Sequence, residues 1–403
     1  MPGAATGGIS CPCRFRVAAL PPGGSRTPRS RCGPASPPTP TAPTSPAVVP
    51  ASPEVVMRFE SRHPLQPYWD LVGAPLQVQA LEQALTLGLF DLLQAPTAPA
   101  QVAERLQLDR SASATWLELL WSMGLLTRHA PPQPSAAPEY GVSAVAARFF
   151  REASSENCTQ AWLYRARLLG RFASQMESLL RDGHDPAADM AHTSAPAGSW
   201  AQAARMQIGQ EQRHISVPAV LERLACLHAL PDTGRLLDLG GGPGHVAIAL
   251  AQRLAGWRGT VCDGPETAAV AQENIQRAGL DTRLDTLGCD LNQDGFGSGY
   301  DLVWCSSVLH FMKDPHALLR RICESLAPGG VALLAHAEVP DDPAVAAAVM
   351  PFYTSLKFRG NYLPAAGEVP AAMTLAGFEG VQALGRLAFP LAPVWLYLGR
   401  RPA

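Results

Sequence analysis

The chain has 403 residues, which is long enough for two domains with a sizeable hydrophobic core. Basic and acidic side chains nearly balance, with a formal net charge of −2, so charge gives no basis for binding nucleic acid or an anionic membrane. Nine cysteines are scattered without the paired spacing of a metal site, and no apolar run is long enough to span a membrane. We therefore expect a cytoplasmic protein in a reducing compartment, with no metal centre.

Residues 1–56 differ in composition from the rest of the chain. They are rich in Pro, Gly, Ser and Thr, contain five arginines and have no acidic residue before Glu54. Such a segment buries too little apolar surface to offset its ordering entropy. We interpret it as a disordered tail, or as an over-extended start with Met57 as the true first residue; a transit peptide is the alternative.

A helical pattern of apolar residues follows this tail. Its leucine-rich stripe predicts a helix that ends at Gly88, because glycine is common just beyond helix C-termini. Two more helices are predicted at 101–108 and 113–123. Ser111 or Ser113 is expected to cap the second of these two helices.

Two predicted strands, at 124–128 and 139–142, complete a winged helix within residues 57–157. Many winged helices bind DNA, which makes a cofactor-sensing DNA-binding regulator one candidate function. Helix 113–123, however, contains no Arg or Lys to contact phosphates or guanine edges. Its apolar residues favour a place in the core or in a subunit interface.

Residues 158–223 have helical patterns and are expected to link this region to a second domain. The linking helices and the second domain together occupy residues 158–403. The second domain contains the most informative stretch of the chain, RLLDLGGGPGH at 235–245. Its leucines predict a buried parallel strand, its glycines a sharp turn, and a helix is expected to begin near Val246. This combination is typical of a nucleotide-type cofactor site at the carboxyl edge of a sheet.

The residues of this turn favour a cationic cofactor. A dinucleotide-binding fold would have the spacing G-x-G-x-x-G, whereas here the carboxylate of Asp238 stands beside the glycines and would repel a pyrophosphate. S-adenosylmethionine carries an ammonium and a sulfonium and no phosphate. We expect Asp238, Gly240 and Gly242 to hold the methionine end of this cofactor.

Later strand ends agree with this cofactor. A second strand is predicted to end at Asp263, roughly 20 residues on, where a carboxylate usually accepts the ribose hydroxyls. A third strand end is followed by Asp290 and Leu291, which are expected to bind the adenine amino group and to cover its ring. A fourth apolar strand begins at Tyr300 and runs into a polar loop.

Three short motifs occur beyond this strand: Leu-His followed by Asp within 308–314, Pro-Gly-Gly within 326–330 and Ala-Gly-Phe within 375–380. With these motifs the chain resembles the class I methyltransferases, specifically small-molecule O-methyltransferases with an N-terminal dimerisation domain. That group includes caffeate-type and acetylserotonin enzymes and bacterial enzymes acting on polyketides, carotenoids and bacteriochlorophyll precursors. The resemblance extends from about residue 65 to the end.

The resemblance implies an α/β fold, in which a Rossmann-like, mostly parallel seven-stranded sheet follows a mainly helical winged-helix domain that forms a homodimer. It also implies methyl transfer from S-adenosylmethionine to a hydroxyl of a hydrophobic small molecule, a secondary metabolite or pigment precursor. His310 matches the family's catalytic histidine, and a neutral imidazole suits proton removal near pH 7. Carbon methylation of a tetrapyrrole or other pigment ring is the alternative reaction.

The surroundings of His310 depart from the plant members of the family. Their Asp-Trp after the histidine is Phe-Met at 311–312 here. The first of the two glutamates that orient their histidine falls at His336, and Glu338 and Glu368 lie nearby in sequence but out of register. Either another group orients His310, or the acceptor needs little deprotonation.

The remaining candidate site residues rest on their position relative to the family. Ser306 stands where plant members carry a lysine over the cofactor, so we count it among the cofactor contacts. Met206, Met350 and Tyr353 lie in segments that contact the acceptor in relatives, and we expect them to bind substrate. Their side chains suit an apolar or aromatic acceptor.

Overall fold

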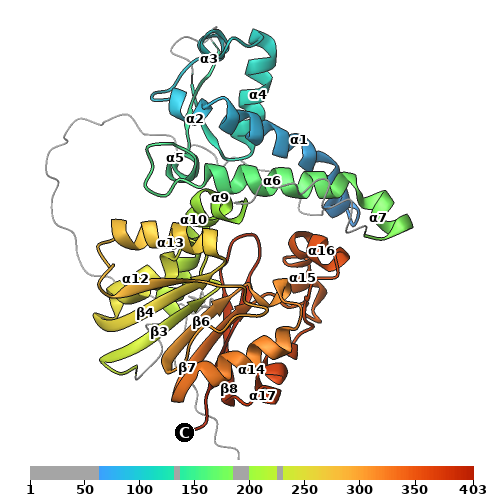
Figure 1. Cartoon of the computed structure of the whole chain (residues 1–403). Coiled ribbons are helices and arrows are strands. Elements are labelled where there is room, and N and C mark those ends of the chain that lie inside the picture. The colour runs from blue at the N-terminus through green and yellow to red at the C-terminus, as the bar shows by residue number, and fades with distance from the viewer. Residues whose placement is uncertain (1–62, 131–136, 185–198, 225–229) are drawn as a thin grey trace, which may run out of the picture. The chain divides into compact units, whose positions relative to one another are not determined.

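The computed structural model describes residues 63–130, 137–184, 199–224 and 230–403 (Figure 1). The interpretations of residues 1–56 as a tail, an over-extended start or a transit peptide lie outside the described residues. Within the described part of the chain, no helix is both long and apolar enough to cross a membrane.

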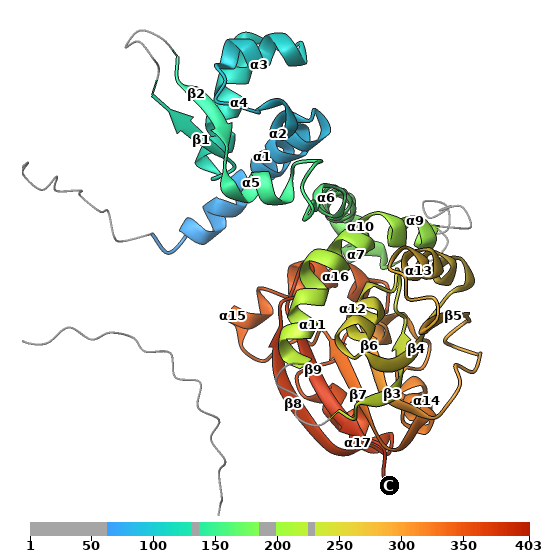
Figure 2. The same cartoon turned by 90° about the vertical axis from the view of Figure 1, so that its left-hand side faces the viewer.

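The N-terminal region consists of helices and one strand pair. Its elements are α1 (Gln66–Thr86), α2 (Leu89–Leu92), α3 (Pro99–Leu106), α4 (Arg110–Ser122), β1 (Leu126–His129), β2 (Glu139–Val142) and α5 (Ala144–Phe149). Helix α1 ends just before Gly88, which adopts a left-handed φ of 67°, as predicted. Strands β1 and β2 pair antiparallel and form the predicted wing (Figure 2).

Asp109 caps helix α4, so the predicted cap at Ser111 or Ser113 was wrong. The Asp109 carboxylate accepts a hydrogen bond of 2.8 Å from the Ala112 N–H, while Ser113 lies buried inside the helix. An aspartate just upstream satisfies one of the free N–H groups of the first turn, and the helix therefore starts earlier. The apolar face of α4 packs into a core that includes Leu85, Phe90, Leu117, Leu120 and Tyr140.

Connecting helices lead from this region to the sheet. They are α6 (Thr159–Ser174), α7 (Met176–Asp182), α9 (Ser199–Arg205), α10 (Gln207–Glu211), the π-helical turn η1 (Gln212–Ser216) and α11 (Val217–Leu224). The π turn has a local cause, because Pro218 has no N–H to donate to the preceding turn. Arg165 on α6 forms an ion pair with the buried carboxylate of Glu211 through hydrogen bonds of 2.7 and 2.8 Å. This pair fixes the segment that enters η1.

A seven-stranded sheet with the strand order β5-β4-β3-β6-β7-β9-β8 forms the C-terminal domain. The strands are β3 (Thr233–Leu239), β4 (Gly256–Asp263), β5 (Leu284–Gly288), β6 (Tyr300–Ser306), β7 (Leu326–His336), β8 (Glu379–Leu387) and β9 (Val394–Arg400). Strands β3 to β7 run parallel, and β9 runs antiparallel to both of its neighbours. The predicted mostly parallel α/β fold is therefore confirmed.

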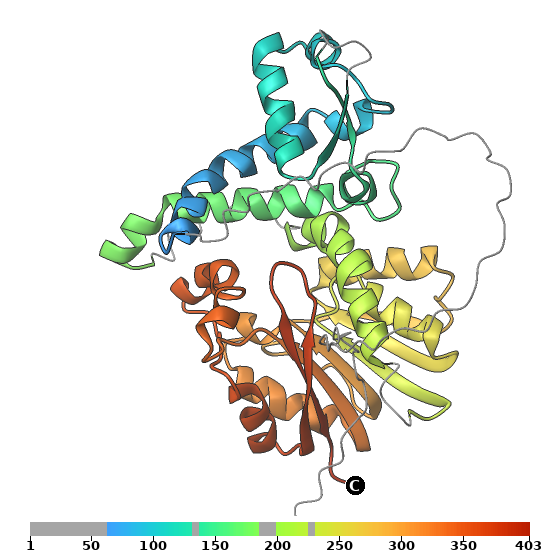
Figure 3. The same cartoon turned by 180° about the vertical axis from the view of Figure 1, so that it is seen from behind.

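Helices cover both faces of this sheet (Figures 2 and 3). One face packs against α11, α12 (His245–Arg253), α13 (Pro265–Arg277) and α16 (Met350–Phe358), and the other against α14 (Pro315–Ser325) and α17 (Glu368–Leu375). Leu236 and Leu237, neighbours on β3, belong to these two opposite cores. Burial on both faces explains why the strand is an unbroken apolar run. The short elements η2 (Leu309–Phe311) and α15 (Pro343–Ala346) complete the domain.

Candidate active site

The carboxyl ends of β3 and β6 form the switch point of the sheet. The chain leaves β3 on one side to form β4 and β5, and returns on the other side to form β6. Ligands of open α/β sheets bind in the crevice at such a point. Asp238 and Gly240 at the end of β3, Asp263 at the end of β4 and Ser306 at the end of β6 all lie at this edge.

The glycine turn after β3 has a backbone that only glycine adopts easily. Gly240, Gly242 and Gly244 have φ values of 68°, 58° and 76°. A Cβ on Gly240 would overlap the side chain of Val308, which lies two residues before His310. The turn therefore packs directly against the loop that carries His310.

Asp263 joins the turn to the neighbouring strand. Its carboxylate accepts hydrogen bonds from the N–H groups of Gly242 at 2.8 Å and of Gly264 at 2.7 Å. Burial raises the pKa of this carboxyl above its ordinary value, although the two N–H groups oppose the rise. Each oxygen has a second lone pair, so the carboxylate remains able to accept hydrogen bonds from a diol.

Asp238 lies beneath the turn and is 2% exposed. Its carboxylate accepts a hydrogen bond of 3.1 Å from the Ala247 N–H in the first turn of α12, and burial raises its pKa to about 7. Among the described residues, no Lys, Arg or His forms an ion pair with it. A buried carboxylate without a cation fits a ligand that brings its own positive charge, such as the ammonium of S-adenosylmethionine.

Gln212 also holds the glycine turn, and sequence reasoning missed it. Its side-chain amide donates to the Gly241 carbonyl at 3.0 Å, and its side-chain oxygen accepts from the His245 N–H at 3.1 Å. Gln212 begins the π turn η1, so it reaches the glycines from a segment outside the sheet. No local motif marks it; only Pro218 hints at an irregular helix there.

Asp290 and Leu291 follow β5, as predicted, but the Asp290 side chain already has local partners. Its carboxylate is exposed and accepts hydrogen bonds from the Asn292 N–H at 2.9 Å and the Gln293 side chain at 2.8 Å. These bonds hold its pKa below the ordinary value. Leu291 packs partly buried against the core beneath α14. The contact of both residues with adenine stays a prediction.

His310 lies on the short helix η2 and is 4% exposed. The loop enters this helix through Ser307, whose left-handed φ of 55° is uncommon for a non-glycine residue and typical of functional turns. The Asn361 side chain donates to the His310 carbonyl at 2.7 Å. Burial first, and then the neighbouring His336 ring and the Arg165 guanidinium, lower the pKa of the His310 imidazole well below 6.5. The ring is therefore neutral at pH 7.

Neither nearby glutamate forms a hydrogen bond with His310. The Glu338 carboxylate accepts from the Tyr397 hydroxyl at 2.8 Å and from backbone N–H groups at the start of α17. Glu368 accepts from the Tyr362 hydroxyl at 2.9 Å. The imidazole ring of His336 lies beside that of His310, with ring centroids 5.0 Å apart.

The predicted substrate residues differ in their distance from His310. Tyr353 is buried, and its ring lies 6.0 Å from that of His310, centroid to centroid. Met350 lies in the first turn of the same helix, α16. Met206 is 38% exposed at the junction of α9 and α10, and no contact joins it to His310. Two aromatic residues that were not predicted as site residues, Trp200 and Phe311, pack edge to face with ring centroids 5.3 Å apart.

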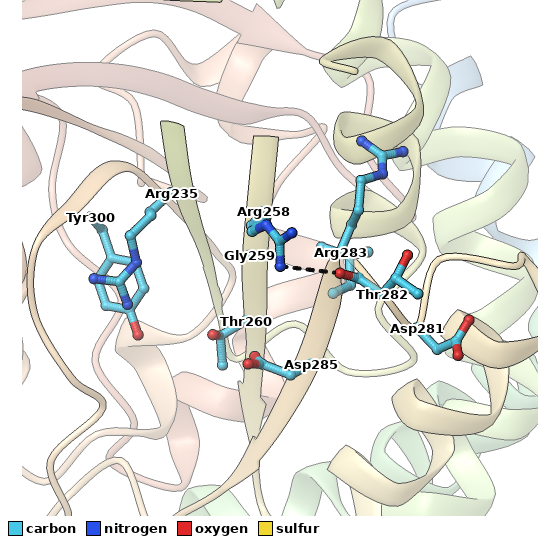
Figure 4. A pocket seen from close by; sticks show the side chains of 10 residues that line it. Arg235, Arg258, Gly259, Thr260, Asp281, Thr282, Arg283, Asp285 and Tyr300 are labelled. Carbon is cyan, nitrogen blue, oxygen red and sulfur yellow. Dashed lines mark hydrogen bonds between the residues drawn. The ribbon is translucent and has the colours of Figure 1, made fainter. Parts of the chain in front are cut away.

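A separate cavity of about 210 Å³ lies toward the amino ends of the strands (Figure 4). Arg235, Asp285 and Tyr300 line it, close to the starts of β3, β5 and β6, and Arg258 donates to the Thr282 carbonyl at 3.3 Å. It is therefore not the crevice formed by the carboxyl ends. Across the described ranges, no cluster of three or more His, Cys, Asp or Glu side chains is arranged to hold a metal ion.

Comparisons with known families cover both domains. Residues 237–332 match the model of a methyltransferase domain, and residues 69–152 match an O-methyltransferase dimerisation domain. The first match contains the glycine turn, Asp263 and His310, and the second spans α1 to α5. Fold and site thus define an S-adenosylmethionine-dependent methyltransferase.

Individual proteins similar to this chain are also methyltransferases. A 3-hydroxy-5-methyl-1-naphthoate 3-O-methyltransferase from Streptomyces sahachiroi is 27% identical over 284 residues, which cover 68% of this chain and 77% of that protein. The N,N-dimethyltransferase OxyT from Streptomyces rimosus is 30% identical over 285 residues, covering 68% and 78% of the two chains. Human N-acetylserotonin methyltransferase has the same fold, with a TM-score of 0.68 at 20% identity over 86% of this chain and 100% of that one. The chain belongs to the S-adenosylmethionine-dependent methyltransferases that carry an N-terminal O-methyltransferase dimerisation domain.

Proposed function

We propose that the protein methylates a hydroxyl group of an aromatic small molecule, a secondary metabolite or pigment precursor, with His310 as general base. One observation carries the proposal: a buried, neutral imidazole adjoins the glycine turn through Val308 and lies beside Tyr353. A general base must be unprotonated at working pH and near the bound acceptor. His310 meets the first condition through burial and the second through its place at the switch point.

The cofactor contacts follow from the chemistry of the crevice. The buried carboxylate of Asp238, with Gly240 and Gly242, binds the methionine end, and Asp263 binds the ribose hydroxyls. Asp290 and Leu291 bind adenine, and Ser306 lines the same edge at the end of β6. When bound, S-adenosylmethionine supplies a methyl group that is already activated for displacement by its sulfonium. The work of the protein is to align the acceptor, exclude water and remove the hydroxyl proton.

Aromatic side chains around His310 indicate the acceptor class. Phe311 lies 4.3 Å and Tyr353 6.0 Å from the His310 ring, centroid to centroid, and Trp200 contacts Phe311. Flat aromatic walls favour a flat aromatic acceptor. The Streptomyces sahachiroi relative is named for a hydroxylated naphthoate, which is the kind of molecule we propose here. Met350 and Met206 are the adaptable apolar residues of this site.

A homodimer is part of the proposal. Helix α1 exposes a row of large apolar side chains, with Trp69 61%, Val72 70% and Leu76 66% exposed. Exposed apolar surface of this extent marks a contact site. Because the match to an O-methyltransferase dimerisation domain begins at residue 69, we assign this surface to a second copy of the chain.

Replacement of the proposed base tests the function. His310→Gln should lower kcat on a hydroxynaphthoate by roughly 10²–10⁴, while the affinity for S-adenosylmethionine stays within about twofold. His316→Gln, on the exposed side of α14, is the matched control and should retain wild-type turnover. Wild-type turnover in His310→Gln would remove this residue from the mechanism.

A further inference from the structure

Two enclosed imidazole nitrogens in the described part of the chain lack a hydrogen-bond partner. They are Nδ1 of His310 and Nε2 of His336. The side chains are 4% and 1% exposed, and their rings lie 5.0 Å apart, centroid to centroid, at an interplanar angle of 60°. Buried polar atoms are nearly always paired in folded proteins. Two unpaired nitrogens on adjacent rings therefore call for one common explanation.

The backbone fixes which nitrogen of His336 carries the proton. Nδ1 of His336 lies 2.7 Å from the carbonyl oxygen of Ala337, and a carbonyl can only accept a hydrogen bond. The proton of the neutral ring is therefore on Nδ1, and Nε2 is left with a free lone pair. Burial keeps the ring neutral, since it lowers the pKa of His336 to about 4.

We infer that His336 positions the proposed base by accepting a hydrogen bond at Nε2 from the Nδ1–H of His310. The inference rests on the proposed function, in which His310 removes the hydroxyl proton. A proton held on Nδ1 leaves the lone pair of His310 on Nε2, the nitrogen available to the acceptor. An N–H···N bond of about 3 Å between two ring edges places the ring centres about 5 Å apart. The observed separation of 5.0 Å between the ring centroids matches this spacing.

His336 stands on a rigid part of the fold. It is the last residue of β7, which pairs with β6, and β6 leads into the loop of His310. Both glutamates near this site are occupied by other partners, Glu338 by Tyr397 and Glu368 by Tyr362. The Ala337 carbonyl, His336 and His310 therefore form a chain of neutral groups that sets the tautomer without a carboxylate.

The tautomer of His310 is the direct test. Nitrogen NMR of the full chain with ¹⁵N-labelled histidine should show His310 protonated at Nδ1, with His310→Gln identifying the signal by its loss. Protonation at Nε2 in the wild-type protein overturns the inference and requires no variant of His336. The signal does not depend on turnover, so this result is distinguishable from the loss of activity in His310→Gln that tests the proposed function.

Two amide variants of His336 test the same point by activity. His336→Gln places an amide oxygen near the former Nε2 and should keep kcat within about threefold, because an acceptor for His310 remains. His336→Asn is too short to present one, and should lower kcat about tenfold or more with KM and cofactor affinity unchanged. Equal kcat in the two variants, with a hydroxynaphthoate as acceptor, overturns the positioning role. Wild-type kcat in His310→Gln is a different result, and it overturns the proposed function itself.

Discussion

The carboxylate of Asp263 accepts a hydrogen bond of 2.8 Å from the backbone N–H of Gly242, and so joins the end of β4 to the glycine turn after β3. The sequence analysis assigned the two residues to different parts of the cofactor, Asp263 to the ribose and Gly242 to the methionine end. In the structure a hydrogen bond joins them directly. The geometry of the turn therefore depends on the same side chain that we propose binds the ribose.

Removal of this carboxylate should weaken cofactor binding. Asp263→Ala leaves the N–H groups of Gly242 and Gly264 unpaired and removes the acceptor for two hydroxyls. Charge-assisted hydrogen bonds contribute about 1.5–3 kcal/mol, so calorimetry with S-adenosylhomocysteine should show an affinity about 10- to 100-fold lower. Asp285→Ala, an exposed aspartate near the start of β5, is the control and should bind normally. Equal affinity in both variants would exclude Asp263 from the cofactor site.

The contact between Gly240 and Val308 can be tested against a glycine in open space. Gly240 and Gly279 have nearly the same φ, 68° and 67°, but a Cβ meets Val308 at Gly240 and nothing within 4 Å at Gly279. Both alanine variants should lose about 1 kcal/mol of stability from backbone strain, and Gly240→Ala should lose more because its Cβ overlaps Val308. Only Gly240→Ala should also lower kcat, since it displaces the loop of His310. Identical melting temperatures and turnover for the two variants would contradict this packing.

Cofactor binding should release a proton from Asp238. The folded-state pKa is raised to about 7 from 3.8, so the buried carboxyl keeps its proton at pH 6, and the stability it contributes falls as pH rises toward 7. Binding of the cofactor's ammonium favours the ionised form. Calorimetry at pH 6 in two buffers of different ionisation enthalpy should detect the released proton. Asp238→Asn should release none, and the absence of release from the wild type would remove the ammonium contact.

Acid should destabilise the protein through its buried histidines. The pKa values of His310 and His336 lie below 6.5, and Arg165 is the cation that faces His310. The unfolded chain therefore binds more protons, and stability is lost as pH falls through about 6.5. Urea midpoints at pH 7.5 and 5.5 should differ less in His336→Gln than in the wild type. The exposed variant His316→Gln should keep the wild-type difference, and an unchanged slope in His336→Gln would contradict the burial of that ring.

The dimer surface on α1 is open to a charge-insertion test. Trp69→Asp places a carboxylate among side chains that are more than half exposed, so it should separate the subunits without unfolding them. Sedimentation should give a monomer for this variant and a dimer for the wild type. Leu375→Asp, at a residue 84% exposed on α17, is the control and should remain a dimer. A dimer of Trp69→Asp would place the interface elsewhere.

Features encoded by neighbouring residues were predictable from the sequence. The glycine turn, the strand end at Asp263, the strand end that precedes Asp290 and the wing all depend on short patterns of apolar residues, glycines and acids. The cap of α4 was mispredicted because Asp109 competes with the serines that follow it. Both residue types are common helix caps, and the aspartate, which comes first in the chain, forms the cap.

The missing parts of the site depend on tertiary contacts. Gln212 reaches the glycine turn from a π turn 29 residues before Gly241, and His336 meets His310 because β7 pairs with β6. Neither residue type at its position carries a recognisable motif. The sequence shows that His336 stands where plant members of the family have a glutamate. Only the packing of the His310 and His336 rings indicates that His336 takes over the role of this glutamate.

The central claim is methyl transfer to an oxygen with His310 as base, and one labelling experiment tests it. Methyl-deuterated S-adenosylmethionine is incubated with a panel of hydroxynaphthoates and phenols, and the label is located by mass spectrometry and NMR. We predict a deuterated methyl ether, formed at least about 100-fold more slowly by His310→Gln. Label on a ring carbon or a nitrogen, or an equal rate for the variant, would contradict the account.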